Sequence, residues 1–258
     1  MSSFERVDDD LVDRHLERIG VPERPSVGLD GLSELMLAHL LAVSFDNLDV
    51  YDQRGVTTEP TDNIAKIVER RRGGWCFELN GAFGALLHSL GFDVRGLGAA
   101  VLLAGPTDVV DHLTLEVRVE DRPWLVDVGF GEAFIRPLDL SKAGPQDGGI
   151  ADFEFLASPK GTTLARHVDG VPEAQFRFKR VTIRPQDLQP TSDRMFGDPE
   201  SFFRREPYAT RLSKVDGSRI TLTPKHLKRV AADGTESIDE VTDFDAQLLE
   251  HFGLDRSG

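Results

Sequence analysis

The 258-residue sequence predicts an α+β fold in which helices come first and strands follow. Over the first 90 residues, apolar side chains recur with the period of about 3.6 residues that is typical of helices with one buried face. From residue 92 the dominant period becomes two, as in half-buried strands. Because helices and strands do not alternate along the chain, we do not expect a parallel sheet built from strand–helix–strand units.

Four helices are expected in this first part, each marked by apolar residues at helical spacing: 11–19, 32–41, 64–68 and 79–90. Gly20 ends the first helix, and Asp30 lies in the N-cap position of the second. Gly91 is suited to the C-terminal end of the fourth, because glycine adopts the left-handed conformation that often ends a helix.

Strands are expected from residue 113 onward, where apolar and polar residues alternate: 113–119, 124–128, 153–156, 175–183 and 219–222. Residues 120–123 form the turn between the first two strands, and 138–149 is predicted to be the longest loop. A last helix is capped by Asp243 and ended by Gly253.

The composition indicates a soluble, cytoplasmic protein. The sequence has 44 acidic and 30 basic residues, and its net charge of −14 argues against non-specific binding to nucleic acid or anionic membranes. The single cysteine excludes an intrachain disulfide and a cysteine-rich zinc site, and we expect no metal. No apolar run approaches the roughly 18 residues of a membrane span, and residues 1–10 lack a hydrophobic signal core.

Cys76 is the first candidate for chemistry. A lone cysteine is commonly a small buried hydrophobic residue. Here, however, two glycines precede the cysteine and a strongly periodic helix follows it. The thiol is therefore expected on the first helical turn, where free N–H groups and the helix dipole favour an anion. On this local context, a reactive thiol and a core residue are equal alternatives.

A thiolate nucleophile needs a base, and the base needs an orienting group. His112 begins a strand, whereas His15, His39 and His88 lie on helices and are expected at the surface or the core edge. Asp127 interrupts an apolar strand, where an unpaired carboxylate would be costly, so this residue must have a partner.

The predicted hairpin places Asp127 and His112 on one face of the sheet but not in contact. If Val119 pairs with Trp124, Asp127 lies opposite Glu116. His112 is then four residues further along the strand, about 13 Å away. Contact between the two side chains would require a wider loop or a bulge.

Residues 72–80 (RGGWCFELN) resemble the active-site signature of the arylamine N-acetyltransferases. Similar matches to this family follow in the same order as in its members: 45–48 (FDNL), 111–115 (DHLTL) and 126–131 (VDVGFG). Residues 198–203 (DPESFF) and 216–217 (DG) resemble the last part of the family more weakly.

The resemblance implies a catalytic triad of Cys76, His112 and Asp127. It also implies a helical bundle over 1–90 that carries the cysteine, a β-barrel over 91–190 that carries the histidine and aspartate, and an α/β lid over 191–258. The implied reaction is ping-pong acetyl transfer from acetyl-CoA, through a thioester on the cysteine, to the nitrogen of an arylamine or arylhydrazine.

Further residues are implied by their match to the family. The cofactor-binding positions are Gly129, Phe130 and Gly131, and the positions around the aromatic acceptor are Phe45, Phe130 and Phe203. The expected partner is thus a small-molecule aromatic amine, and the sequence predicts no oligomeric state.

Two features depart from the family. Residues 44–47 read SFDN where the family usually has Pro-Phe-Glu-Asn, which affects the pocket rather than the chemistry. The net charge of −14 opposes a polyanionic cofactor, so CoA phosphates must be met locally, by backbone N–H groups around Gly129 and Gly131 or by a few arginines. The run 70–72 (RRR) is one candidate, although Arg72 could instead hold a carboxylate such as Glu78.

Two other classes of function fit the same residues. With water as the acceptor, the triad gives a cysteine amidase or thioester hydrolase, and with a tethered amine it gives an amide synthase that closes macrocycles. In the second of these classes Cys76 is structural and the protein is a non-catalytic acyl-CoA-binding module. The presence of a base and an orienting acid argues against this interpretation.

Overall fold

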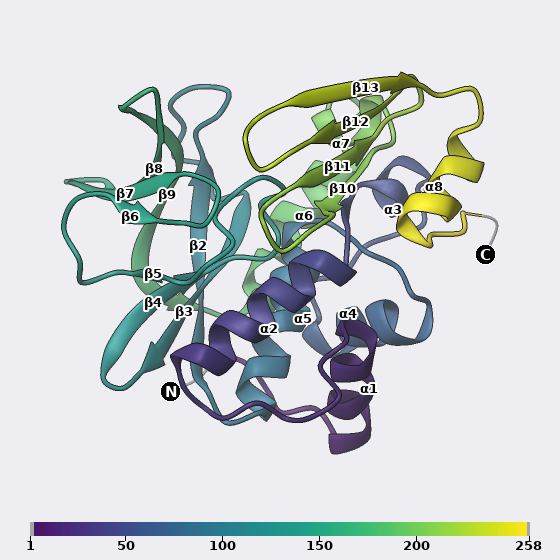
Figure 1. Cartoon of the computed structure of the whole chain (residues 1–258). Helices are drawn as coiled ribbons and strands as arrows, with labels where there is room; N and C mark the ends of the chain where they lie inside the picture. Colours follow the sequence, from purple (N-terminus) through teal and green to yellow (C-terminus); the bar gives the residue numbers. More distant parts are fainter. Residues whose placement is uncertain (1–2, 257–258) are drawn as a thin grey trace.

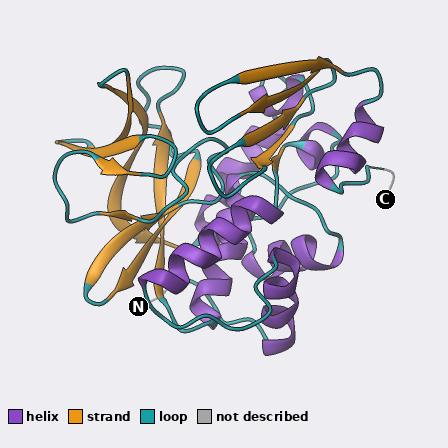
Figure 2. Cartoon of the chain, viewed as in Figure 1, coloured by secondary structure: helices purple, strands orange, loops and turns teal. Residues whose placement is uncertain are grey.

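The computed structural model describes residues 3–256. Within them, helices come first, a large antiparallel sheet lies in the middle, and a smaller sheet with short helices follows (Figure 1). Figure 2 shows the strands in two groups, with the N-terminal helices below the smaller group and beside one side of the larger one. The α+β class predicted from the sequence is confirmed. No helix within the described range combines the length and apolar character needed to cross a membrane.

The N-terminal helices pack around one buried helix. They are α1 (Asp9–Ile19), α2 (Leu29–Ala42), α3 (Leu48–Tyr51), α4 (Pro60–Glu69) and α5 (Cys76–Ser89). Residues 76–87 of α5 are all buried. Gly20 ends α1 in the left-handed conformation, as expected. The prediction for the start of α2 was wrong: Gly28 is the N-cap, and Asp30 lies inside the first turn.

The central sheet curls into a nearly closed barrel. Its strands are β2 (Asp93–Val101), β3 (His112–Val119), β4 (Arg122–Val126), β5 (Leu138–Asp139), β6 (Gln146–Asp147), β7 (Asp152–Ser158), β8 (Gly161–Val168) and β9 (Val171–Ile183). They are arranged in the order β5-β4-β3-β2-β9-β8-β7-β6, with every pair antiparallel. The predicted strand 124–128 is shifted by two residues: β4 begins at Arg122 and ends at Val126.

The segment 138–149 is not simply a long loop, because it contains β5 and β6. The Gln146 side chain replaces a strand partner for Asp139: its oxygen accepts from the Asp139 N–H at 2.9 Å, and its amide donates to the Asp139 carbonyl at 3.0 Å. Such side-chain bonding to the backbone is not visible in a hydropathy pattern.

The C-terminal part combines helices with a second antiparallel sheet. Its elements are η1 (Pro185–Leu188), α6 (Gln189–Gly197), α7 (Phe202–Arg205), β10 (Ala209–Leu212), β11 (Arg219–Leu222), β12 (His226–Val230), β13 (Glu236–Glu240) and α8 (Phe244–Phe252). The edge strand next to β10 is β1 (Phe45–Asp46), which comes from the N-terminal part. Asp243 caps α8 and Gly253 ends it, both as predicted.

Two histidines in the helical part are fully buried rather than at the core edge. The rings of His15 and His39 lie 5.7 Å apart, and His39 meets Phe83 edge-on. Among residues 3–256, neither ring has a hydrogen-bond partner. Burial lowers the pKa of His15 to about 3 and holds the pKa of His39 well below its usual value. Both rings are therefore neutral in the folded protein.

We expect these two histidines to make the fold sensitive to acid. The unfolded chain protonates them below about pH 6.5, whereas the folded chain does not, so their contribution is intact above that pH and is lost as the pH falls toward 3. Substituting His39→Leu should remove about 1.4 kcal/mol per pH unit from the slope of unfolding free energy against pH below 6. Urea unfolding measured from pH 7 to pH 4 tests this.

His226→Gln is the matched control, because it removes an exposed histidine and should leave that slope unchanged. A wild-type slope in the His39→Leu protein would contradict the explanation.

Candidate active site

Cys76 is the first residue of α5 and lies against the barrel. The residue is 4% exposed, and its Sγ is 3.8 Å from the carbonyl oxygen of Asp111, immediately before β3. The approach of the chain to this helix is tight: a Cβ on Gly73 would lie 2.2 Å from the Ser44 carbonyl oxygen and equally close to the Asp46 carboxylate. Only glycine fits there, which explains why residue 73, three positions before the start of α5, is a glycine.

His112 and Asp127 form a buried pair beside this thiol. The imidazole Nε2 lies 2.6 Å from Asp127 Oδ2, and both residues are at most 2% exposed. Burial on its own would lower the pKa of His112. The Asp127 carboxylate and then Cys76 outweigh this effect and raise the pKa to about 10. The arrangement thus favours an imidazolium between a carboxylate and a sulfur.

The hairpin register differs from the predicted one, and the difference creates this contact. Val119 pairs with Arg122 across a two-residue turn, in which Glu120 and Asp121 have φ of 51° and 60°. Positive φ at both positions is the geometry of tight hairpin turns. Asp127 is therefore two positions from His112 rather than four, within reach across the diagonal of a sheet. The prediction that contact needs a wider loop or a bulge was wrong.

Asn80 joins the cysteine helix to the barrel, and sequence reasoning gave it no role. Its amide nitrogen donates to Asp127 Oδ1 at 2.8 Å and to the Leu113 carbonyl at 2.6 Å, while its oxygen accepts from the Val128 N–H at 2.9 Å. It lies four residues after Cys76, so the two side chains share one helix face. The four-residue spacing from Cys76, inside the 72–80 motif, is the sequence signal that could have identified Asn80.

Gly129 closes the same junction. Its N–H donates to Asp127 Oδ1 at 2.9 Å, and a Cβ there would lie 2.8 Å from both the Asn80 amide nitrogen and the Cys76 Cα. The structure thus requires glycine at this position so that the segment after β4 can pack against α5.

The aromatic residues singled out in the sequence fall into two groups. Phe130 meets the His112 ring edge-on at 5.2 Å and packs on Phe176. The rings of Phe45 and Phe203 lie 6.4 Å apart. Two aromatic residues that the sequence analysis gave no role pack against them: Tyr208 on Phe45 and Trp75 on Phe203. Gly131 stands next to the second group, since a Cβ on it would lie 3.7 Å from the Phe45 ring.

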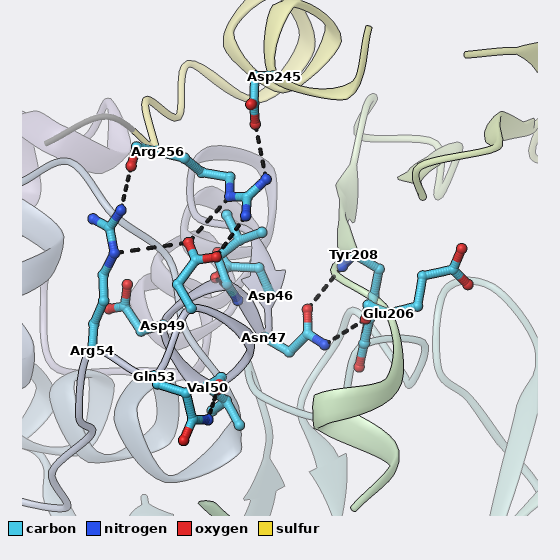
Figure 3. A network of polar contacts seen from close by, with 12 residues as sticks. Asp46, Asn47, Asp49, Val50, Gln53, Arg54, Glu206, Tyr208, Asp245 and Arg256 are labelled. Carbon is cyan, nitrogen blue, oxygen red and sulfur yellow. Dashed lines mark hydrogen bonds and ion pairs between the residues drawn. The ribbon is translucent and has the colours of Figure 1, made fainter. Parts of the chain in front are cut away.

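Tyr208 belongs to the surroundings of the thiol. Burial raises the pKa of its phenol, and the charges of Asp46 and Cys76 raise it further, so the hydroxyl stays neutral. Figure 3 shows how its backbone is fixed: the Tyr208 N–H donates to the Asn47 side chain, which in turn donates to the Glu206 carbonyl. The same Asn47 amide also donates to the Phe203 carbonyl at 2.8 Å.

A buried cluster of charges holds the start of α5 from the other side. Lys66 lies 2.7 Å from carboxylate oxygens of both Glu78 and Asp49, and Glu78 also accepts from the Trp75 N–H at 3.3 Å. Arg72 is 2.6 Å from Asp49 and donates to a C-terminal carbonyl. The suggested Arg72–Glu78 pair is therefore wrong. Being buried and paired in this way, Arg72 is not placed to meet a phosphate.

The segment that departs from the family pattern lies beside this cluster. Asp46 accepts from the Ser44 hydroxyl at 2.9 Å and from the Leu48 N–H at 3.3 Å. Burial raises its pKa to about 6, although the positive charges of Lys66 and Arg72 oppose the shift. Ser44 and Asp46 thus form a local pair that satisfies the shorter carboxylate.

Replacing Asn80 should test how strongly the helix is joined to the barrel. Asn80→Ala removes the amide that binds the Leu113 carbonyl, the Val128 N–H and Asp127 Oδ1. We therefore expect the free energy of unfolding to fall by about 2–4 kcal/mol. Asn63→Ala is the matched control. Asn63 is equally buried, on α4, but its amide has no hydrogen-bond partner within residues 3–256, so its loss should cost much less. Equal losses in urea unfolding would contradict the account.

Comparison with known proteins agrees with this architecture. A family model described as N-acetyltransferase matches residues 28–257. The arylamine N-acetyltransferase / N-hydroxyarylamine O-acetyltransferase of Salmonella typhimurium is 32% identical over 256 residues, covering 93% of this chain and 85% of that protein.

Solved structures are similar over nearly the whole chain. The Salmonella typhimurium arylamine N-acetyltransferase has a TM-score of 0.89 at 29% identity, covering 97% of this chain and 92% of that one. The Mycobacterium marinum arylamine N-acetyltransferase in complex with CoA has a TM-score of 0.85 at 29% identity, covering 94% and 92%. The chain therefore belongs to the arylamine N-acetyltransferase family and is an acyltransferase.

Proposed function

We propose that this protein transfers the acetyl group of acetyl-CoA to an aromatic amine through a thioester on Cys76. The observation that carries the proposal is the buried His112–Asp127 pair beside the only cysteine of the chain. A thiol, a base and an orienting carboxylate on three different elements are the set that nucleophilic acyl transfer needs.

In the first half-reaction the Cys76 sulfur attacks the acetyl carbonyl of acetyl-CoA. The helix N-terminus favours the thiolate, and the charged imidazole of His112 stands beside it. As the carbon–sulfur bond to CoA breaks, His112 gives its proton to the departing sulfur. The acetyl group remains on Cys76, and His112 is left neutral.

In the second half-reaction the acceptor nitrogen attacks the thioester. His112 takes the proton from this nitrogen, the bond between the acetyl carbon and Cys76 breaks, and the amide leaves. The thiolate–imidazolium pair is then restored. Asp127 stabilises the charged ring and holds it in one orientation.

The same proposal assigns the surrounding residues. Gly129, Phe130 and Gly131 contact the cofactor, because Gly129 lies against the backbone of Cys76, Phe130 against His112 and Gly131 against Phe45. Phe45, Phe130 and Phe203 contact the acceptor: Phe130 packs against His112, and Phe45 and Phe203 belong to the aromatic group that includes Trp75, the residue before Cys76, so both groups offer aromatic faces suited to an aromatic ring.

Intact-protein mass spectrometry tests the covalent step. Incubation with acetyl-CoA should add about 42 Da, the mass of one acetyl group less a hydrogen, and neutral hydroxylamine or an arylamine should remove it, as expected for a thioester. The Cys76→Ala protein should show no increment.

Two results would contradict this proposal. An increment that persists in Cys76→Ala would place the acetyl group elsewhere. An adduct that water discharges as fast as an arylamine does would identify the protein as a hydrolase.

Asp127→Asn should abolish turnover without unfolding the protein. The Asn oxygen would still accept from Asn80 and Gly129, so its amide nitrogen would face His112 Nε2 and force the proton onto the other ring nitrogen. The ring can then no longer accept a proton at the thiol, and kcat/KM should fall about a thousandfold to ten-thousandfold. Asp139→Asn, which changes a buried aspartate outside the site, should have little effect. Near-normal turnover in Asp127→Asn would contradict the triad.

A further inference from the structure

Tyr208 gives the aromatic group around Phe45 a polar atom that a ligand can reach. The group also contains Trp75, Phe202 and Phe203. The Trp75 indole N–H is unpaired within residues 3–256, but its side chain is fully buried. Tyr208 is only partly buried. Its hydroxyl is therefore the one accessible polar side-chain atom of this group.

The backbone and the ring of Tyr208 are fixed, whereas its hydroxyl has no partner. The backbone N–H donates to the Asn47 side chain at 2.8 Å, and the backbone carbonyl accepts from the Asn47 N–H at 3.4 Å. The ring packs against Phe45 and Phe202, with 6.0 and 5.9 Å between ring centroids. None of residues 3–256 forms a hydrogen bond with the phenol oxygen. Tyr208 thus holds an unpaired hydroxyl on a ring that is kept in place.

The pairing of β1 with β10 places this ring on the same face of the sheet as Phe45. The antiparallel register that pairs Asp46 with Ala209 continues by one residue. It puts Asn47 opposite Tyr208. Side chains alternate along a strand, and directly opposed residues share a face. Phe45 and Tyr208 therefore project from one face, and Asp46 projects from the other, toward the buried charges.

The acceptor site proposed above lies on the Phe45 face. A Cβ on Gly131 would lie 3.7 Å from the Phe45 ring. An aromatic acceptor that packs on Phe45 beside Cys76 is therefore next to the Tyr208 ring. Burial, and then the negative charges of Asp46 and Cys76, raise the pKa of the Tyr208 phenol, so its oxygen keeps the proton and can donate it to a hydrogen bond.

We propose that the Tyr208 hydroxyl selects aromatic amines that carry an uncharged hydrogen-bond acceptor on the ring. The inference rests on the proposed function, because it concerns the same acceptor site. The hydroxyl donates to an ether, carbonyl or hydroxyl oxygen, whereas an apolar substituent at that place leaves the donor unpaired. An anionic substituent would also accept the hydrogen bond, but it would lie near the Asp46 carboxylate, so an uncharged oxygen is favoured.

Discharge of the Cys76 thioester by a matched pair of amines tests the proposal. Para-methoxyaniline and para-ethylaniline have similar shapes, but only the first has a ring substituent that accepts a hydrogen bond. The acetylated protein is mixed with each amine, and the ratio of the two rate constants is compared between wild type and Tyr208→Phe. Because both proteins meet the same amines, differences in the amines' own reactivity cancel. The ratio of methoxy to ethyl should be about 3-fold to 10-fold lower in Tyr208→Phe, the effect of one uncharged hydrogen bond.

Tyr51→Phe is the matched control. It removes the hydroxyl of the other tyrosine of the chain, which lies on α3 beneath the Arg256 guanidinium, and it should leave the ratio at its wild-type value. The meta-substituted pair is measured in the same way, so that both orientations of the substituent are covered. A ratio that Tyr208→Phe leaves unchanged in the para and the meta pair would overturn the assignment, and so would an equal fall in Tyr51→Phe.

The proposed function fails in a different way, through absence of an acetyl adduct on Cys76. Calorimetric titration of the unacetylated proteins with the same amines does not depend on that step. A preference for methoxyaniline over ethylaniline that is lost in Tyr208→Phe supports the assignment. Equal affinities of the wild-type protein for the two amines would contradict it.

Discussion

The site depends on one buried amide. Asn80 links α5 to the barrel through the Leu113 carbonyl, the Val128 N–H and the Asp127 carboxylate. Because it lies one turn after Cys76 on the same helix face, these bonds also set where the sulfur meets the barrel. Gly129 allows the two elements to come this close. Without this link, Cys76 and His112 would belong to two parts of the fold that are placed separately.

The opposite side of the helix start is held by charge. Lys66 bridges Glu78 and Asp49 with little exposure to solvent, and Glu78 binds the backbone N–H of Trp75. The attraction within a buried ion pair often does not exceed the cost of removing both charges from water. This cluster therefore fixes the position of the start of α5 more than it stabilises the fold. β1 adds a backbone link, since the Asp46 N–H donates to the Gly74 carbonyl. The chain just before Cys76 is thus held on one side by Glu78 and on the other by β1, the edge strand of the C-terminal sheet.

What the sequence predicted well was local. The periodicity and caps of α8, the extent of β11 and the place of Cys76 at a helix start follow from nearby residues. The buried Asp127 was expected to need a partner, but the register that supplies it depends on positive φ in a two-residue turn that contains no glycine. The pairing of Lys66 with Glu78 and the burial of Arg219 depend on contacts between distant segments, which periodicity does not report.

We propose that Asp127, held by Asn80, keeps the His112 ring charged beside the Cys76 sulfur. Nitrogen-15 NMR of the imidazole, assigned by comparison with His112→Gln, measures that charge directly. We expect both ring nitrogens of His112 to carry protons at pH 7 and the ring to titrate near pH 10. A ring that is neutral at pH 7 and titrates near the ordinary value of about 6.5 would contradict it.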